Sequence, residues 1–298
     1  MAIEVFAPAK VNLCLHVTGQ RDDGYHLLDS LVAFAPVGDS LKITDGKSLS
    51  LTVDGPEAAG VPVDESNLVM KAAALMGEGQ GAAMTLTKNL PAASGIGGGS
   101  SDAAAALRGL LRHWDREDLA DMPQSRFAEI ADKALGLGAD LPMCLMCRPA
   151  RVRGIGERID FTNLGPIPTV LVNPRIEVST PKIFAALASR ENAPLPDELP
   201  AFSDVNAFAE WLAQQRNDLQ APALKVEPAI GRVLDTFERA DGCLLSRMSG
   251  SGATCFGVFP DEEAALAAEH HIRTAHPDWW VQAGSLGDQS ERARPQVS

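Results

Sequence analysis

The 298-residue sequence has no long hydrophobic run and no excess of basic residues. No apolar stretch approaches the roughly 18 residues that suggest a membrane span. The first residues, Met1 to Phe6, lack the basic start and apolar core of a signal peptide. The net charge of −13 argues against broad binding of nucleic acid or of an anionic membrane surface. We therefore expect a cytoplasmic protein with neither nucleic acid nor a membrane as a partner.

Cysteine is scarce and odd in number, with five residues. Cys144 and Cys147 have a C-x-x-C spacing, but no second pair and no histidine lie near them in the sequence. Their surroundings predict an apolar strand from Met143 to Cys147. These features favour reduced thiols in the core over a metal or redox site. The sequence therefore predicts no protein-bound metal centre.

Aromatic residues make up only 5% of the chain, and Tyr25 is the single tyrosine. It stands beside His26, where a turn-rich segment, Gly19 to Gly24, leads into a predicted strand. Such a pair can cap the edge of a sheet, or it can stack on a planar ligand and hydrogen-bond it. The residues alone leave both interpretations open.

Glycine, in contrast, is concentrated in one stretch, Leu90 to Asp102. The alternating segment Ala83–Lys88 before it predicts a strand, and the apolar spacing after it predicts a helix from Ser101 to Trp114. A glycine-rich loop at a helix N-terminus is suited to bind phosphate, because its backbone N–H groups can approach an anion closely. The P-loop pattern G-x-x-x-x-G-K-[ST] is not present, because no lysine follows these glycines. The dinucleotide-binding pattern G-x-G-x-x-G is not present either, because Ser100 stands where its last glycine is required. An ordinary glycine-rich connection remains the alternative.

The rest of the chain alternates strands and helices around a Pro-rich link, Gly165 to Pro168, which is the best candidate for a domain boundary. We predict an N-terminal domain over 1–163, a C-terminal domain over 164–283 and a polar, frayed tail over 284–298. The predicted strands are Ile3–Ala7, Val11–Val17, Leu27–Phe34, Ser40–Thr44, Leu49–Val53, Thr169–Val172, Cys243–Ser246, Cys255–Phe259 and Trp279–Gln282, with a hairpin over 151–161. The predicted helices are Asn67–Met76, Pro123–Leu135, one opening at Thr180, Val205–Gln214, Ala229–Ala240 and Asp261–Ala275.

Two charged residues stand at the ends of predicted elements. Lys10 follows Pro8, which is expected to break the chain between the first two strands. Asp140 stands on the tight turn from Gly136 to Pro142. Taken alone, Lys10 is typical of a solvated surface lysine and Asp140 of a residue that bonds its own turn.

Three stretches together resemble the GHMP kinases: Pro8 to Leu13, the glycine-rich loop, and Met248 to Thr254. Their order and spacing match that family over almost the whole chain. The resemblance implies an α+β fold of two domains. The N-terminal domain binds ATP and is similar to a ribosomal protein domain, and the C-terminal domain is ferredoxin-like. It also implies an ATP-dependent small-molecule kinase.

The resemblance assigns Asp140 as the catalytic aspartate that accepts the hydroxyl proton, and Lys10 as the partner that holds it ionised. ATP would lie on the loop, with Mg²⁺ held mainly through its phosphates. The implied ATP-binding residues are Pro91, Ala92, Ala93, Ser94, Gly95, Ile96, Gly97, Gly98, Gly99, Ser100 and Ser101. The sequence departs from many relatives at 92–94, where Ala-Ala-Ser replaces glycine and leaves the backbone less free.

Within the family, Gly19 to His26 and Gly138 to Pro142 are most similar to members whose substrate is a cytidine diphosphate sugar alcohol. In such a site Tyr25 and Phe184 would sandwich the pyrimidine, and His26 would bond its edge. The further implied contacts are Asn12 and Thr180 for the substrate, Asn67 and Lys88 for adenine, and Glu129 either as a magnesium ligand or as a solvated helix residue.

Two alternatives remain open at this point. One is a kinase of the same family for another substrate, such as mevalonate or homoserine. The other is a non-catalytic binding module, because the N-terminal fold of the family resembles RNA-binding ribosomal domains. The acidic charge and the presence of both Lys10 and Asp140 favour a kinase. The sequence does not distinguish a monomer from a homodimer.

Overall fold

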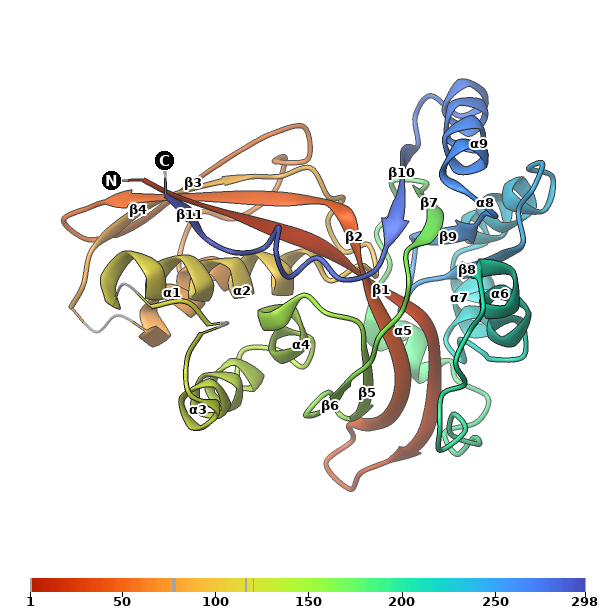
Figure 1. Cartoon of the computed structure of the whole chain (residues 1–298), viewed down its shortest axis with the longest axis horizontal. Helices are drawn as coiled ribbons and strands as arrows, with labels where there is room; N and C mark the ends of the chain where they lie inside the picture. Colours follow the sequence, from red (N-terminus) through yellow and green to blue (C-terminus); the bar gives the residue numbers. More distant parts are fainter. Residues whose placement is uncertain (1, 77–78, 116, 120, 298) are drawn as a thin grey trace.

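A computed structural model of the chain describes residues 2–76, 79–115, 117–119 and 121–297. It contains two β-sheets that lie side by side, each with helices against it (Figure 1). The first sheet has the strand order β11-β1-β2-β4-β3, and β2 also pairs with β5, which pairs with β6. Its strands are β1 (Ile3–Gln20), β2 (His26–Asp45), β3 (Leu49–Asp54), β4 (Ala82–Thr87), β5 (Ala150–Gly154), β6 (Arg158–Phe161) and β11 (Gln296–Val297).

Strands β1 and β2 are long and continuous, and they pair along almost their whole length. The predicted break at Pro8 was therefore wrong. Pro8 stands opposite Gly38 at a shift of register before Lys10, and a bulge of this kind tolerates the missing N–H group. The two strands approach so closely that a Cβ at Gly38 would lie 2.2 Å from the carbonyl oxygen of Ala7. Glycine is thus required at position 38, where β2 lies against β1.

Helices cover one face of the first sheet, with α1 and α2 lying along it (Figure 1). Helix α2 packs through four consecutive alanines, Ala103 to Ala106, all fully buried. Gly109 lies so near the sheet that a Cβ there would meet Ile43 Cδ1 at 2.5 Å. These small residues allow the middle and the end of α2 to pack closely against β1 and β2. The helices of this half are α1 (Leu68–Met76), α2 (Gly98–Leu110), the π-helical turn η1 (Leu111–Asp115), α3 (Gln124–Leu135) and α4 (Leu141–Met146).

Helix α4 corrects the strand predicted over Met143–Cys147. The segment is a short helix with Pro142 in its first turn, and it ends at Cys147, whose φ is +52°. An apolar run of this length has no clear periodicity, so the sequence pattern does not separate a buried strand from a buried helix. The five cysteines are all free thiols, and four of them are buried. Burial raises the pKa of the Cys144 thiol well above its usual value.

The second sheet is antiparallel with the order β10-β7-β9-β8. With the intervening helices this is a βαββαβ arrangement, which is ferredoxin-like as predicted. One face packs on β1 and β2, and the other is covered by α8 and α9. Helix α7 was not predicted. The elements are β7 (Ile167–Asn173), β8 (Leu245–Met248), β9 (Cys255–Val258), β10 (Trp280–Leu286), α5 (Thr180–Ala185), α6 (Val205–Ala213), α7 (Gln220–Val226), α8 (Ala229–Glu238) and α9 (Glu262–Ala275).

The C-terminal segment is not frayed, contrary to the prediction. Strand β10 extends to Leu286, and the chain then returns along the first sheet, where β11 pairs with the start of β1 (Figure 1). Ala293 is buried, and its carbonyl oxygen accepts a hydrogen bond from Nε of Arg108 on α2 at 3.0 Å. The prediction failed because it rested on the polar composition of the segment, whereas backbone pairing with β1 and the bond to Arg108 hold the segment in place.

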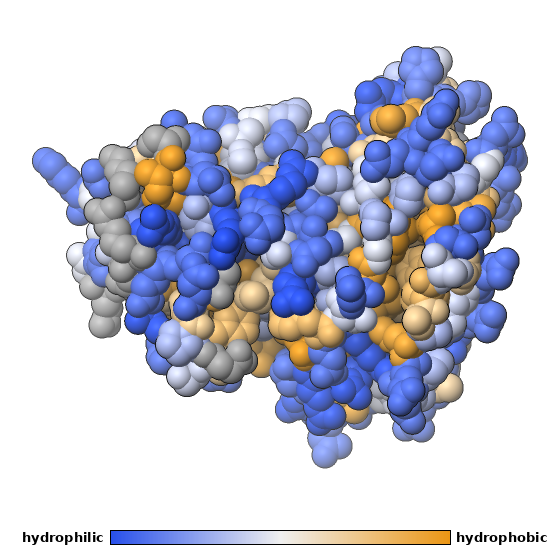
Figure 2. Space-filling model, in the orientation of Figure 1, coloured by the Kyte–Doolittle hydropathy of each residue, from blue (hydrophilic) through white to orange (hydrophobic). Residues whose placement is uncertain are grey.

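The visible surface is mostly hydrophilic, and hydrophobic residues appear on it as small patches (Figure 2). Within the described part of the chain, no helix is both long enough and apolar enough to cross a membrane. The core consists of three apolar clusters, and β1 contributes residues to each of them.

Candidate active site

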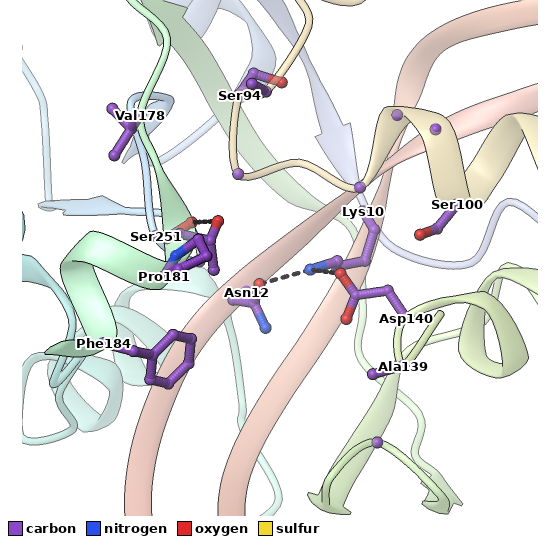
Figure 3. Close-up of a pocket in the computed structure, with 18 of the residues that line it drawn as sticks. Lys10, Asn12, Ser94, Ser100, Ala139, Asp140, Val178, Pro181, Phe184 and Ser251 are labelled. Atoms are coloured by element: carbon purple, nitrogen blue, oxygen red, sulfur yellow. Dashed lines mark hydrogen bonds and ion pairs between the residues drawn. The ribbon is translucent and has the colours of Figure 1, made fainter. Parts of the chain in front are cut away.

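A cavity of 1270 Å³ lies beside β1, on the side where the first sheet faces the glycine-rich loop and α5. Its wall is formed by β1, the glycine-rich loop, the turn before α4, the start of α5 and the segment around Tyr25. Figure 3 shows side chains from β1, the turn before α4 and helix α5 around one space. The cavity is large enough for two small-molecule ligands at once.

Lys10 and Asp140 meet in this cavity although 130 positions separate them in the sequence. Lys10 Nζ lies 2.9 Å from Asp140 Oδ2, and the Lys10 side chain is only 4% exposed. The Asp140 side chain is 41% exposed and faces the open space. Asp140 is the N-cap residue of α4, but its carboxylate does not bond the helix. The carboxylate is thus held at one oxygen by Lys10 and remains accessible to a ligand.

Asn12 fixes the other side of the Lys10 ammonium group. Its Oδ1 accepts a hydrogen bond from Lys10 Nζ at 2.8 Å (Figure 3). Its Nδ2 donates to Ser30 Oγ at 2.8 Å. The Asn12 backbone N–H donates to Ser249 Oγ at 3.0 Å, and this hydroxyl donates to the carbonyl oxygen of Gly95. Both ends of the Asn12 amide are therefore used inside the protein, and Asn12 supports Lys10 while it also lines the cavity.

The glycine-rich loop ends at Gly97, the N-cap of α2, with a φ of +65°. The first N–H groups of a helix have no partners within it, and Gly97 has no side chain to cap them. Gly98, Gly99 and Ser100, which carry these groups, all line the cavity. A Cβ at Gly97 would lie 3.1 Å from Lys10 Cε, so the loop also approaches Lys10 closely. These residues fit an anion such as a nucleotide phosphate.

The third motif, Met248 to Thr254, supports the loop from behind. Gly95 has a φ of +76°, and a Cβ there would lie 2.5 Å from the carbonyl oxygen of Ser249. The Thr254 N–H donates to the carbonyl oxygen of Ser94 at 3.1 Å. Two glycine-rich segments thus pack backbone against backbone, which explains why both motifs are needed for one loop conformation.

The departure at 92–94 is visible in the backbone. Ala93 has a φ of +46°, a left-handed conformation that favours glycine. Pro91, Ala92, Ala93 and Ser94 still line the cavity. A non-glycine residue therefore occupies a strained, left-handed position in the loop.

An aromatic pair lies at the other end of the cavity. The His26 ring stacks on Phe184 with a centroid distance of 4.6 Å and an interplanar angle of 28°. Tyr25 is 60% exposed, so the structure pairs His26, and not Tyr25, with Phe184. His26 Nε2 is buried without a hydrogen-bond partner. Burial, followed by the charge of Arg190, lowers the pKa of His26 and favours its neutral form.

Thr180 lies close to this aromatic pair at the start of α5. Its Oγ1 is 2.7 Å from Ser251 Oγ, and both residues line the cavity. The sequence predicted a helix that opens with Thr180 as its N-cap, but the N-cap of α5 is Ser179. The hydroxyl groups of Thr180 and Ser251 thus lie together in the wall of the cavity.

Three residues assigned to nucleotide or metal have other partners. Lys88 Nζ is buried and donates to both Asp39 and Asp102. Asn67 bonds the Pro62 carbonyl oxygen and the Val69 N–H across the start of α1, although it also lines the cavity. Glu129 pairs with Lys133 on α3 at 2.9 Å, outside the main cavity. No cluster of three or more histidine, cysteine or acidic residues suited to a metal occurs among the described residues.

Sequence reasoning missed Ser30, Ser249 and Ser251, which carry the hydrogen bonds behind Lys10 and Thr180. Ser249 and Ser251 belong to a motif that was noticed, but only the fold shows that their hydroxyls turn toward β1 and α5. Ser30 gave no signal, because an isolated serine in a strand has no distinguishing pattern. It is found only once β1 and β2 are paired.

Comparison with known proteins agrees with this geometry. The family model described as the GHMP kinases N terminal domain matches residues 67–148, and the GHMP kinases C terminal model matches residues 198–278. The chain is 52% identical to the 4-diphosphocytidyl-2-C-methyl-D-erythritol kinase of Roseobacter denitrificans, a match that covers 99% of this chain and 97% of that protein. It is 53% identical to the enzyme of the same name from Ruegeria pomeroyi, covering 96% and 100%.

Solved structures give the same result. A crystal structure of 4-(cytidine 5'-diphospho)-2C-methyl-D-erythritol kinase matches with a TM-score of 0.73 and 33% identity, covering 95% of this chain and 99% of that one. The homoserine kinase of Cytophaga hutchinsonii matches with a TM-score of 0.65 at 20% identity, covering 100% and 97%. The second likeness concerns the fold alone.

Proposed function

The chain belongs to the GHMP kinase family, and from this premise we propose that it transfers the γ-phosphoryl group of ATP to the 2-hydroxyl group of 4-diphosphocytidyl-2-C-methyl-D-erythritol. The products are the 2-phosphate and ADP, and the reaction serves isoprenoid precursor synthesis by the non-mevalonate route. The observation that carries the proposal is the identity of 52–53% to relatives of that name over nearly the whole of both chains. The relatives' name also disfavours mevalonate or homoserine as the substrate.

The glycine-rich loop and the start of α2 are the proposed phosphate site. Gly98, Gly99 and Ser100 offer N–H groups that have no partner in the helix, and the partial positive charge of the helix start favours an anion. Mg²⁺, held mainly through the nucleotide phosphates, supplies additional charge neutralisation. Because phosphoryl transfer depends mostly on positioning and charge stabilisation, a rigid loop backed by the third motif suits the reaction.

Asp140 is the proposed base. One carboxylate oxygen is held by Lys10 at 2.9 Å, and the side chain is open to the cavity near the start of α2. It accepts the proton of the substrate hydroxyl as the new O–P bond forms. Lys10, fixed by Asn12 at 2.8 Å, orients the carboxylate and balances negative charge at the attacking oxygen. The pair thus needs to act as a unit.

The cytidine end is assigned to the pocket around Phe184. Its ring provides one stacking face, and His26 Nε2 is a buried nitrogen without a partner that a base edge can satisfy. In the structure the His26 ring itself occupies the position against Phe184, so binding of the pyrimidine between Tyr25 and Phe184 requires the His26 ring to turn aside. Thr180 stands nearby for the remaining polar groups.

All of these residues come from one chain, so a monomer or a homodimer would serve equally. The substrates are small, charged and water-soluble, and we assign the activity to the cytoplasm.

A coupled assay of ADP release tests the proposal. The purified chain is given ATP and Mg²⁺ with 4-diphosphocytidyl-2-C-methyl-D-erythritol, mevalonate or homoserine in separate reactions. We expect turnover with the first acceptor only, and the position of the new phosphate is read by phosphorus NMR. Equal or greater activity with mevalonate or homoserine would overturn the assignment.

A further inference from the structure

The cavity is lined by three cationic side chains, and two of them are already neutralised. Lys10 is paired with Asp140, and Lys88 is paired with Asp39 and Asp102. The third is Arg190, which is exposed at the wall of the cavity. Within the part of the chain that the structure describes, no hydrogen bond or ion pair engages its guanidinium group. A cation that lines a cavity without a partner is available to a ligand.

The backbone around Arg190 is held in place although its side chain is free. Two residues further on, Asn192 is fixed to β1, because its N–H and its Nδ2 both donate to the carbonyl oxygen of Val17 at 3.1 and 3.0 Å. Asn192 Nδ2 also lies 3.2 Å from Asp218 Oδ2. The segment is thereby anchored beside the loop that carries Tyr25 and His26. The effect of Arg190 on the pKa of His26 reflects the same proximity.

The proposed substrate carries a diphosphate between its two recognised ends. Its hydroxyl must reach Asp140, and its cytosine must reach Phe184, so the diphosphate has to lie in the part of the cavity between or beside them. The chain as a whole carries a charge of −13, which disfavours an uncompensated dianion. A guanidinium group suits this task, since its planar fork donates two parallel hydrogen bonds to phosphate oxygens.

We propose that Arg190 binds the diphosphate of the acceptor substrate and makes the enzyme selective for diphosphate-linked cytidine compounds. This inference rests on the proposed function, because it takes the acceptor to be a cytidine diphosphate derivative. Arg190 does not touch the reacting atoms, so its contribution is to acceptor affinity. It should not alter ATP binding, which uses the opposite end of the cavity.

The test compares CDP with cytidine, which differ only in the diphosphate. Calorimetric titration of the full chain gives the Kd of each ligand for the wild type, Arg190→Gln, Arg190→Lys and the control Arg239→Gln. Arg239 is an exposed arginine at the end of α8, outside the cavity, and its removal changes the net charge equally. We expect Arg190→Gln to weaken CDP about 10-fold and cytidine less than twofold. Arg190→Lys should be intermediate, because it keeps the charge and loses the fork.

Steady-state kinetics adds a second readout. Arg190→Gln should raise the KM for the acceptor about 10-fold and leave the KM for ATP and kcat within twofold. Added salt should raise the acceptor KM of the wild type more than that of the variant. Equal weakening of CDP and cytidine, or no change in either, would overturn the assignment of Arg190. If the wild type binds CDP through Arg190 but does not phosphorylate the acceptor, the proposed function fails instead.

Discussion

Replacing Lys88 by methionine should strongly destabilise the protein. Lys88 Nζ donates to Asp39 and, at 2.7 Å, to Oδ2 of Asp102, and all three side chains are buried. Asp39 also accepts the N–H groups of Asn89 and Leu90 at 2.6 and 2.9 Å through its other oxygen. Asp102 lies in the first turns of α2. The cluster therefore joins the chain before the glycine-rich loop to the helix after it.

The expected loss of folding stability follows from the charges in this cluster. Burial alone would lower the pKa of Lys88, but the neighbouring charges of Asp102 and Asp39 hold it above its usual value. Without the ammonium group, two carboxylates share a dry site, and removing one partner of a buried ion pair typically costs about 3–5 kcal/mol. Asp102 Oδ1 already has no hydrogen-bond partner among the described residues, so only the Asn89 and Leu90 N–H groups on Asp39 would remain to compensate the two carboxylates. Against a total stability of about 5–15 kcal/mol, such a loss is large.

Protonation should relieve part of this cost. Burial, and then the charge of Asp39, raises the pKa of Asp102 well above its ordinary range. A group whose pKa is raised on folding stabilises the fold as the pH falls through that pKa. Without Lys88 the uptake of a proton should be stronger, so the deficit of Lys88→Met should shrink from pH 8 to pH 5. The double variant Lys88→Met, Asp102→Asn should lose less than the sum of the single losses.

Urea unfolding followed by circular dichroism at pH 5, 6.5 and 8 measures these differences, provided the m-value is unchanged. Asp102→Asn alone serves as the matched control, since it keeps the shape of the side chain. A Lys88→Met protein within 1 kcal/mol of the wild type at pH 8 would refute the reasoning, as would a deficit that grows at lower pH.

Three further results are expected. Asp140→Asn should lower kcat by about 10²–10⁴-fold and leave KM within a few-fold of the wild-type value. Adding Lys10→Met should lower kcat little further, because the two residues act as a unit. A kcat near that of the wild type would place the base elsewhere. Gly98→Val should fold, because its Cβ meets only ordinary contacts, yet weaken ATP binding in calorimetry; unchanged affinity would make the loop purely structural. His16 should contribute a loss of stability as the pH drops below 6.5, because burial and then the charge of Arg216 lower its pKa. The unfolding midpoint of His16→Gln should therefore depend less on pH than that of the surface control His270→Gln, and equal slopes would contradict this.

The sequence predicted the parts that depend on local pattern. A glycine-rich loop followed by a helix was predicted correctly, because the glycines favour a loop and the run from Ala103 to Ala106 favours a helix. The bounds differ, since α2 begins at Gly98 and not at Ser101, and the chain from Leu111 to Asp115 is π-helical. The strand predicted at 143–147 was wrong because a run of five apolar residues fits the period of a strand and that of a helix equally well. The break at Pro8 failed because the opposing strand accommodates a bulge there.

The site depended on contacts that no local pattern contains. Lys10 and Asp140 each look like a surface residue in the sequence, and only the fold brings them to 2.9 Å. Lys88 illustrates the reverse case, since its place beside the loop suggested a ligand contact, whereas Asp39 and Asp102 engage its charge. Resemblance to a family located the motifs and paired Lys10 with Asp140, but it did not supply the partners of Asn12, Lys88 or Thr180.

The continuity of β1 limits how the enzyme can move. From Ile3 to Val17 the strand contributes successive residues to all three apolar clusters, and it is paired with β2 throughout. A hinge between the two sheets would have to bend this strand and tear its packing, whereas interiors of proteins resist such deformation. The proposed phosphate loop and the proposed cytidine pocket thus lie along one continuous strand, which keeps the spacing between them constant. We therefore expect substrates to be captured and released by movement of the loops beside β1, and not by closure of one sheet toward the other.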